Sequence, residues 1–127
     1  MSADPAEGIR IEVETAYLEG ESEPDDGRYV FAYTITIHND GERAARLLTR
    51  RWRITDANGR VREVEGDGVV GEQPYLRPGE GFRYTSGAQL ETSMGTMTGS
   101  YGMVDADGES FDAEVPEFLL TVPRTLH

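Results

Sequence analysis

Residues 66 to 71 read GDGVVG and match the spacing G-x-G-x-x-G through Gly66, Gly68 and Gly71. In dinucleotide-binding folds this spacing brings backbone amides to a pyrophosphate, provided that the glycines follow a strand and open a helix. Here Pro74 and Pro78 follow within a few residues, and two prolines so close together prevent a regular helix. We therefore interpret the three glycines first as loop architecture, at positions where a positive φ or close packing requires glycine.

An anion site remains a second interpretation of the same loop, because consecutive backbone amides can bind an anion without a helix. The stretch RLLTRRWR places four arginines around Trp52 in an otherwise acidic chain. Guanidinium groups hold phosphates through paired hydrogen bonds. The candidate anion or pyrophosphate site therefore comprises Gly66, Gly68, Gly71, Arg51 and Arg53.

The arginines also have a purely structural interpretation. Alternation along residues 48–54 predicts Leu48, Trp52 and Ile54 on the inward side of a strand and Arg51 and Arg53 on the outward side. On that outward side the two arginines would form cross-strand ion pairs with glutamates such as Glu63 and Glu65.

Apolar residues in and after the glycine stretch suggest a different use, the docking of another protein. We expect Val69, Val70 and Tyr75 to be exposed and to form a candidate partner-binding loop, with Leu76 beside them. The alternative is that Val70 and Leu76 belong to the core.

The sequence holds little material for catalysis. A Ser-His-Asp site would depend on His38, which lies at the polar parity of a strand, and no G-x-S-x-G motif is present. The stretches around Asn58-Gly59 and Asp107-Gly108 fit hairpin turns better than a calcium loop. We expect no enzymatic activity, no cofactor and no metal site.

The composition narrows the class of partner. The formal net charge is −12, from 12 basic and 24 acidic residues. Such a charge repels a phosphate backbone, so we expect no nucleic-acid partner. Cysteine is absent, and no apolar run approaches the ~20 residues of a membrane span. We expect a soluble cytoplasmic protein with no membrane partner.

Period-2 alternation dominates the chain and predicts an all-β fold. It is clearest in YVFAYTITI, where Phe31, Tyr33, Ile35 and Ile37 share one face. Eight or nine short strands are expected, with FDAEV and EFLLTV as separate strands near the end. Turns punctuate them, and no segment has the period of a helix. We expect a single domain over residues 1–127, an antiparallel β-sandwich with an ordered core from about residue 9 to residue 122.

The stretch GDGVVGEQPYLRPGEGFRYTSGAQLETSMGTMTGSY resembles the signature of the ApaG family. The segments YVFAYTITIHNDG, LLTRRWRITDANG and FDAEVPEFLLTVP fit the same family, so the resemblance covers nearly the whole chain. It implies an immunoglobulin-like or fibronectin type III-like β-sandwich. It also implies a link by genetics to cobalt and magnesium efflux, which must be indirect because nothing in the chain spans a membrane.

Similar domains occur in eukaryotic F-box proteins and in a polymerase-associated protein, where they resemble partner-binding modules. The family has no established catalytic residues to carry over. We therefore predict a non-enzymatic binding module for an unknown protein partner, with weak homodimerisation kept open. The alternative is a small-molecule sensor that binds pyrophosphate or a (di)nucleotide polyphosphate through the 66–71 loop and the nearby arginines.

Overall fold

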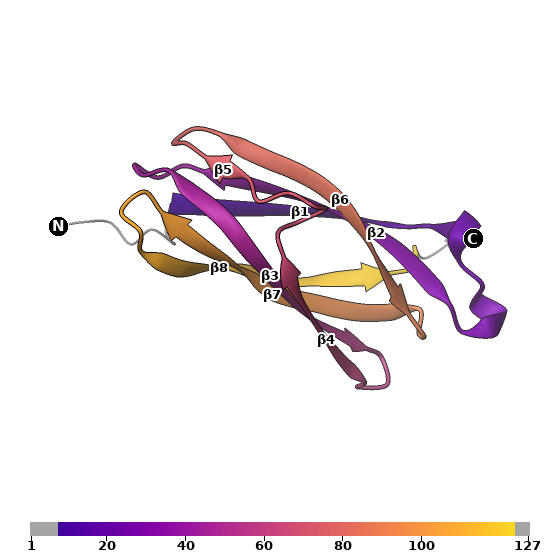
Figure 1. Cartoon of the computed structure of the whole chain (residues 1–127). Coiled ribbons are helices and arrows are strands. Elements are labelled where there is room, and N and C mark those ends of the chain that lie inside the picture. Colours follow the sequence, from indigo (N-terminus) through magenta and orange to yellow (C-terminus); the bar gives the residue numbers. More distant parts are fainter. Residues whose placement is uncertain (1–7, 124–127) are drawn as a thin grey trace.

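The computed structural model describes residues 8–123, and this part of the chain is built from strands (Figure 1). Two short 3-10 turns, η2 (Glu19–Glu21) and η3 (Pro24–Asp26), separate the first two strands. The strands are β1 (Ile9–Tyr17), β2 (Tyr29–Asn39), β3 (Ala45–Asp56), β4 (Val61–Asp67), β5 (Tyr75–Leu76), β6 (Gly81–Leu90), β7 (Met94–Asp105) and β8 (Ser110–Thr121).

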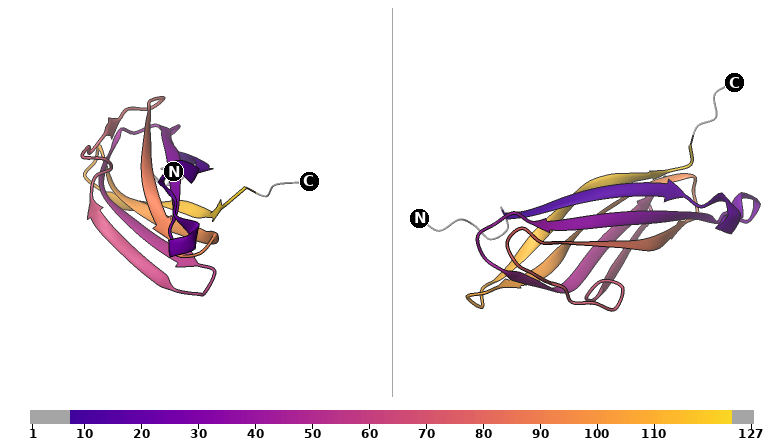
Figure 2. Two further views of the ribbon diagram at one scale, coloured as in Figure 1. Left: turned by 90° about the vertical axis from the view of Figure 1, so that its right-hand side faces the viewer. Right: turned by 90° about the horizontal axis from the view of Figure 1, so that it is seen from above.

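The strands form two antiparallel sheets that pack face to face (Figure 2). One sheet has the order β1-β2-β6, and the other has the order β4-β3-β7-β8. The short strand β5 pairs with the start of β3, at Ala45 and Arg46. β4 pairs with the later part of β3, and the glycine stretch connects β4 to β5. The all-β antiparallel sandwich predicted from the sequence is confirmed. The finer fibronectin type III-like assignment stays a prediction.

The core lies between the sheets and follows the predicted alternation. Phe31, Tyr33, Ile35 and Ile37 of β2 are all buried, because every second side chain of a strand points to the same face. The other sheet contributes buried residues from β3, β7 and β8, which are Leu47, Trp52, Ile54, Met97, Tyr101, Met103, Ala113, Val115 and Leu120.

A bulge in β3 changes one predicted position. Leu47 pairs with Met103 and Thr49 pairs with Gly102, so Leu48 is an extra residue in β3. The prediction that Leu48 points inward with Trp52 was wrong: Leu47 is fully buried and Leu48 is half-buried. An added residue reverses the parity of a strand, and simple alternation cannot anticipate it.

The separate strands expected from FDAEV and EFLLTV form one continuous strand, β8. Pro116 lies inside it, where the register with β7 shifts between Met97 and Gly99. Because β8 is an edge strand, a residue without a backbone N–H is tolerated there. The predicted turns at Asn58-Gly59 and Asp107-Gly108 are confirmed as the β3–β4 and β7–β8 hairpins.

Candidate functional site

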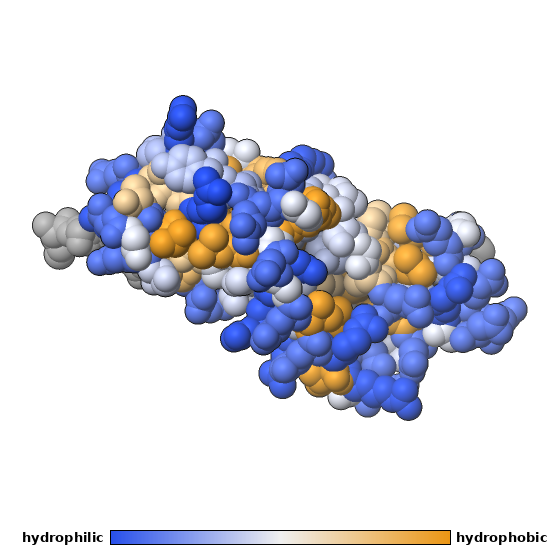
Figure 3. Space-filling view, viewed as in Figure 1, coloured by the Kyte–Doolittle hydropathy of each residue, from blue (hydrophilic) through white to orange (hydrophobic). Residues whose placement is uncertain are grey.

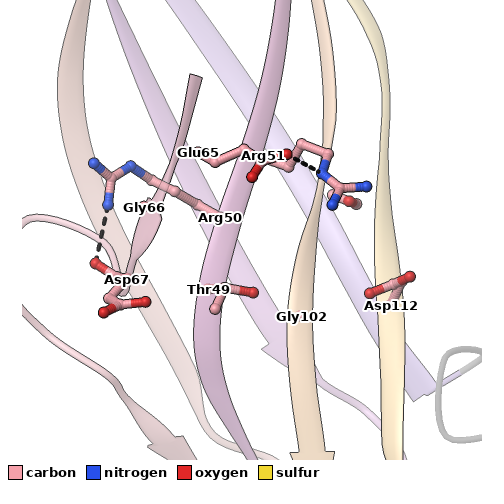
Figure 4. Close-up of a pocket in the computed structure, with 9 residues that line it drawn as sticks. Thr49, Arg50, Arg51, Glu65, Gly66, Asp67, Gly102 and Asp112 are labelled. Atoms are coloured by element: carbon pink, nitrogen blue, oxygen red, sulfur yellow. Dashed lines mark hydrogen bonds and ion pairs between the residues drawn. The ribbon is translucent and has the colours of Figure 1, made fainter. Parts of the chain in front are cut away.

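The first glycine of the stretch makes room for an arginine. Gly66 of β4 pairs with Arg50 of β3, and the guanidinium group of Arg50 lies over it. A Cβ atom at Gly66 would come within 2.7–2.8 Å of three guanidinium atoms. Arg50 Nη1 donates hydrogen bonds to the carbonyl oxygens of Asp67 at 3.0 Å and Gly68 at 2.9 Å. Figure 4 shows the bond to Asp67.

The other two glycines shape a tight turn. Val69 and Glu72 exchange two backbone hydrogen bonds of 2.8 and 2.9 Å, and the two residues between them have positive φ values. These values, 45° at Val70 and 82° at Gly71, define a type I′ turn. Gly68 has a φ of 64°, and a Cβ there would lie 2.4 Å from the carbonyl oxygen of Glu72.

The hydrogen bonds of this loop are largely internal. The amide of Gly68 donates to the carbonyl oxygen of Leu48, the bulge residue, at 2.8 Å. The side-chain amide of Gln73 donates to the same oxygen at 2.9 Å. The amides of Val69 and Glu72 close the turn. Since these donors are occupied, the geometry supports the architectural interpretation of the glycines, and the anion site stays a prediction.

Arg51 and Arg53 are exposed on the outer face of the sheet that contains β3. Arg51 extends away from Arg50 (Figure 4). Arg51 Nε lies 3.0 Å from Glu65 Oε1, and Arg53 Nε lies 3.8 Å from Glu63 Oε1. The predicted cross-strand ion pairs are confirmed. Beside them lies an open groove of about 350 Å³, whose lining includes Arg51, Glu65, Asp67, Ser100, Gly102 and Asp112.

Two residues of the predicted partner-binding loop are exposed, and the others are buried. Val70 is 57% exposed and Tyr75 is 48% exposed, as expected of a docking surface. The expectation that Val69 is exposed was wrong, because the turn folds back on β3 and its side chain joins the core at 0% exposure. Leu76 is also buried. Arg46 lies over the ring of Tyr75, with Cζ 5.3 Å from the ring centroid.

Figure 3 shows the molecule from the side of Figure 1, with apolar side chains in separate patches between hydrophilic ones. No single large apolar patch dominates this face. Docking here would therefore depend on individual apolar anchors surrounded by polar groups, which is how many transient interfaces are built.

A buried pair of tyrosines is the feature that the sequence analysis missed. Tyr84 of β6 and Tyr101 of β7 share a hydrogen bond of 2.5 Å between their hydroxyl groups, across the two sheets. Burial raises the pKa of both phenols well above the usual range, and the hydrogen bond between them lowers that of Tyr84 in part. Alternation along β6 and β7 could have placed both tyrosines on the inward face. Which tyrosines meet across the two sheets depends on register and packing.

The side chains that could serve in catalysis or metal binding do not form a cluster in the described part of the chain. His38 is half-buried, with Nε2 3.5 Å from a carboxylate oxygen of Glu12. Within residues 8–123, no three His, Cys, Asp or Glu side chains form a group able to hold a metal ion. No helix in this stretch is long and apolar enough to cross a membrane.

These features define a class, a small antiparallel β-sandwich whose loops are ordered by internal hydrogen bonds. The sequence profile of the ApaG domain matches residues 19–105, and the chain belongs to the ApaG family. It is 62% identical to Protein ApaG of Stenotrophomonas maltophilia (strain K279a), over 94% of each chain. It is 60% identical to Protein ApaG of Azoarcus sp. (strain BH72), over 96% of this chain and 98% of that one.

A crystal structure of an ApaA protein from Bordetella pertussis superimposes on this fold with a TM-score of 0.89. The two are 48% identical, and the match covers 92% of this chain and 95% of the other. Family membership and fold are therefore established together.

Proposed function

We propose that this chain is a non-enzymatic binding module that docks a protein partner through the tip of the β4–β5 loop. The observation that carries the proposal is Val70, an exposed apolar residue with a φ of 45°. Type I′ turns favour glycine or asparagine at such a position, and the left-handed region is costly for a β-branched residue. Backbone strain of about 1–3 kcal/mol per residue clusters at ligand-binding, catalytic and switch sites.

The neighbouring residues fit the same role. Tyr75 offers an exposed aromatic ring, and Arg46 stacks on it. Tyrosine and arginine are enriched among the residues that dominate binding energy at protein interfaces. The stacked guanidinium also restrains the ring, which lowers the entropy lost when a partner orders it.

A partner would also account for the link to divalent ions that the resemblance implies, with no metal site needed among residues 8–123. A protein that binds a transporter or its regulator alters ion levels indirectly. Such a partner would be met in the cytoplasm, the compartment that the sequence predicts. This part of the proposal rests on the resemblance to the ApaG family.

The test compares Val70→Asn with Val61→Asn. Asparagine tolerates a positive φ, so Val70→Asn keeps the turn while removing the apolar group. Val61 of β4 is also exposed, at 48%, and controls for the loss of a surface valine. Affinity capture from cell extract should yield proteins that both wild type and Val61→Asn retain and that Val70→Asn loses. Equal capture by all three forms would refute the loop as the docking site.

The second candidate is a sensor of pyrophosphate or (di)nucleotide polyphosphates. The groove of about 350 Å³ beside Arg51 favours it, whereas the occupied amides of Gly68, Val69 and Glu72 count against it. Thermal shift with pyrophosphate, ATP, diadenosine tetraphosphate, Mg²⁺ and Co²⁺ distinguishes the two candidates. A ligand at ~100 times its Kd adds about 2.7 kcal/mol. That equals several degrees in Tm.

A shift caused by a phosphate compound and abolished by Arg51→Ala would establish the sensor and displace the first proposal. No shift with any of these compounds would leave Arg51 and Arg53 as surface ion pairs. The search would then continue with protein partners alone.

A further inference from the structure

The edges of the two sheets are protected to different degrees. The β1 edge carries Arg10, Glu12 and Glu14 in alternation, and β8 contains Pro116 at a register shift. β4 is 7 residues long and has charged residues at four positions. Charges, prolines, bulges and short length are the devices that keep edge strands from pairing with other chains.

β6 lacks most of these devices. It spans 10 residues without a proline, and its register with β2 is unbroken. Arg83 is its one charged residue. Half of the residues in this strand are small, which are Gly81, Thr85, Ser86, Gly87 and Ala88, so few long side chains shield the backbone.

The free backbone groups of β6 can be assigned by residue. The amide of Asn39 in β2 donates to the carbonyl oxygen of Glu80, whereas the carbonyl oxygen of Gln89 accepts a bond from the side chain of Arg62 in β4. Backbone groups alternate along a strand, so even-numbered residues face β2 and odd-numbered residues face away from it. The row that faces away from β2 therefore comprises Gly81, Arg83, Thr85, Gly87 and Gln89. Within residues 8–123, the Gln89 carbonyl is the one backbone group of this row with a hydrogen-bond partner.

A cavity lies beside one end of this row. It measures about 220 Å³, and its lining includes the apolar residues Ile54, Val61 and Leu90. Leu90 ends β6, and Ile54 and Val61 belong to the β3–β4 hairpin opposite. A strand added to β6 would direct alternate side chains toward the interior, and the one beside Leu90 would reach this cavity.

The charges around the cavity indicate the chemistry of the added strand. Arg60 pairs with Glu91 at 2.7 Å. Arg62 has no carboxylate partner among residues 8–123, and its guanidinium donates to the Gln89 carbonyl at 3.1 Å. A backbone N–H from an added strand would replace Arg62 at that carbonyl, leaving the guanidinium free to bind a carboxylate.

We propose that the β6 edge accepts an extended segment of a partner protein as an added antiparallel or parallel strand. The segment carries an apolar side chain for the cavity beside Leu90 and an acidic side chain for Arg62. Strand addition of this kind draws affinity from backbone hydrogen bonds and specificity from side-chain pockets. The β6 edge and the cavity beside Leu90 do not include Val70 or Tyr75, so this inference does not depend on the loop proposal.

The probe is a displayed library of random linear peptides, each long enough to span β6, selected against the whole protein. Selected peptides should contain an alternating segment with one large apolar and one acidic residue. Hydrogen exchange should show the amides of Arg83, Thr85 and Gly87 to be fast in the free protein and slow in the complex. The amides of Tyr84 and Ser86 are already bonded to β2, so they should be slow in both states.

Thr85→Pro removes one outward amide and leaves the β2 ladder intact, while Thr85→Val keeps that amide. We expect Thr85→Pro to weaken peptide binding at least about tenfold, the loss of roughly one backbone hydrogen bond. Thr85→Val should bind as wild type does. If Thr85→Pro does not fold, Gly87→Pro with Gly87→Ala as its control makes the same comparison, since a Cβ at Gly87 meets its nearest neighbour at 3.6 Å.

Arg62→Gln should weaken binding of acidic peptides and leave binding of their asparagine analogues unchanged. The proposal is overturned if selection yields no binding peptide, if bound peptides protect amides elsewhere, or if Thr85→Pro and Thr85→Val bind equally well. The Val70→Asn variant should bind these peptides normally, so failure here and failure of the loop proposal are separate results.

Discussion

Arg50 and Arg51 are neighbours in the chain, yet they have opposite roles. Arg50 extends on the inner side of β3, lies over Gly66 and holds the carbonyl groups of the loop. Arg51 lies on the outer side in an exposed ion pair with Glu65. A guanidinium committed to backbone carbonyls is part of the architecture, whereas an exposed ion pair contributes little to stability and can exchange partners.

The largest effect should come from the glycine that the loop cannot replace. Gly68→Ala adds a Cβ 2.4 Å from the Glu72 carbonyl at a φ of 64°. Overpacking costs about 1–3 kcal/mol, and the left-handed region costs a further 1–2 kcal/mol. We expect a loss of about 3 kcal/mol in the free energy of unfolding, measured by urea denaturation.

Gly71→Ala is the matched control for this substitution. Its φ is also positive, at 82°, but no atom lies within 4 Å of the added Cβ. We therefore expect a loss of only about 1 kcal/mol. Equal losses for the two alanine variants would show that the clash between the added Cβ and the Glu72 carbonyl is relieved without cost.

The second effect separates Arg50 from Arg51 directly. Arg50→Met keeps the aliphatic stem but removes both hydrogen bonds to loop carbonyls, so we expect a loss of about 2 kcal/mol. Arg51→Met should cost less than about 1 kcal/mol, because exposed ion pairs contribute little. Hydrogen exchange should also show faster exchange of the Gly68 amide in Arg50→Met alone. A larger loss for Arg51→Met would reverse the assignment of the two roles.

The sequence predicted the architecture because alternation and turn chemistry are local signals. Phe31 to Ile37 and the turn at Asn58-Gly59 could be assigned from neighbouring residues alone. The cross-strand pairing of Arg51 and Arg53 with glutamates of β4 also followed from the sequence, since one hairpin turn links β3 and β4. In these elements, residues that are close in the sequence also make the contacts that define the structure.

The remaining features depend on contacts between distant residues. The bulge at Leu48 is stabilised by Gly68 and Gln73, so nothing within β3 marks it. The burial of Val69 follows from the path of the loop over β3. The exposure of the β6 edge follows from strand order, which alternation does not determine.

The contrast between the two sides of β3 extends into the core. Arg50 lowers the pKa of Tyr84 slightly, against the larger effect of burial, so the inner side of β3 is electrostatically coupled to the tyrosine pair. The raised pKa values mean that folded Tyr84 and Tyr101 keep their protons after the unfolded phenols ionise. Their contribution is complete below the unfolded pKa of about 10 and is lost as the pH rises further.

Between pH 10 and pH 11, we expect the free energy of unfolding to fall by about 1 kcal/mol for each of the two tyrosines. Replacing both residues with phenylalanine should flatten this alkaline decline while changing stability little at pH 7, because both partners of the hydrogen bond are removed together. Urea denaturation at each pH measures the slope. An unchanged slope in the double variant would place the alkaline sensitivity elsewhere.

The smallest effect should come from the outer face. Replacing Arg51 and Arg53 together with glutamine should lower stability by less than about 1 kcal/mol at low salt. Near 1 M salt the difference should nearly vanish, since the screening length falls to about 3 Å. The double variant Glu63→Gln/Glu65→Gln removes the same pairs from the other side and should lose a similar amount. A salt-independent loss above about 2 kcal/mol would mean that the outer arginines, like Arg50, belong to the architecture and are unavailable to any ligand.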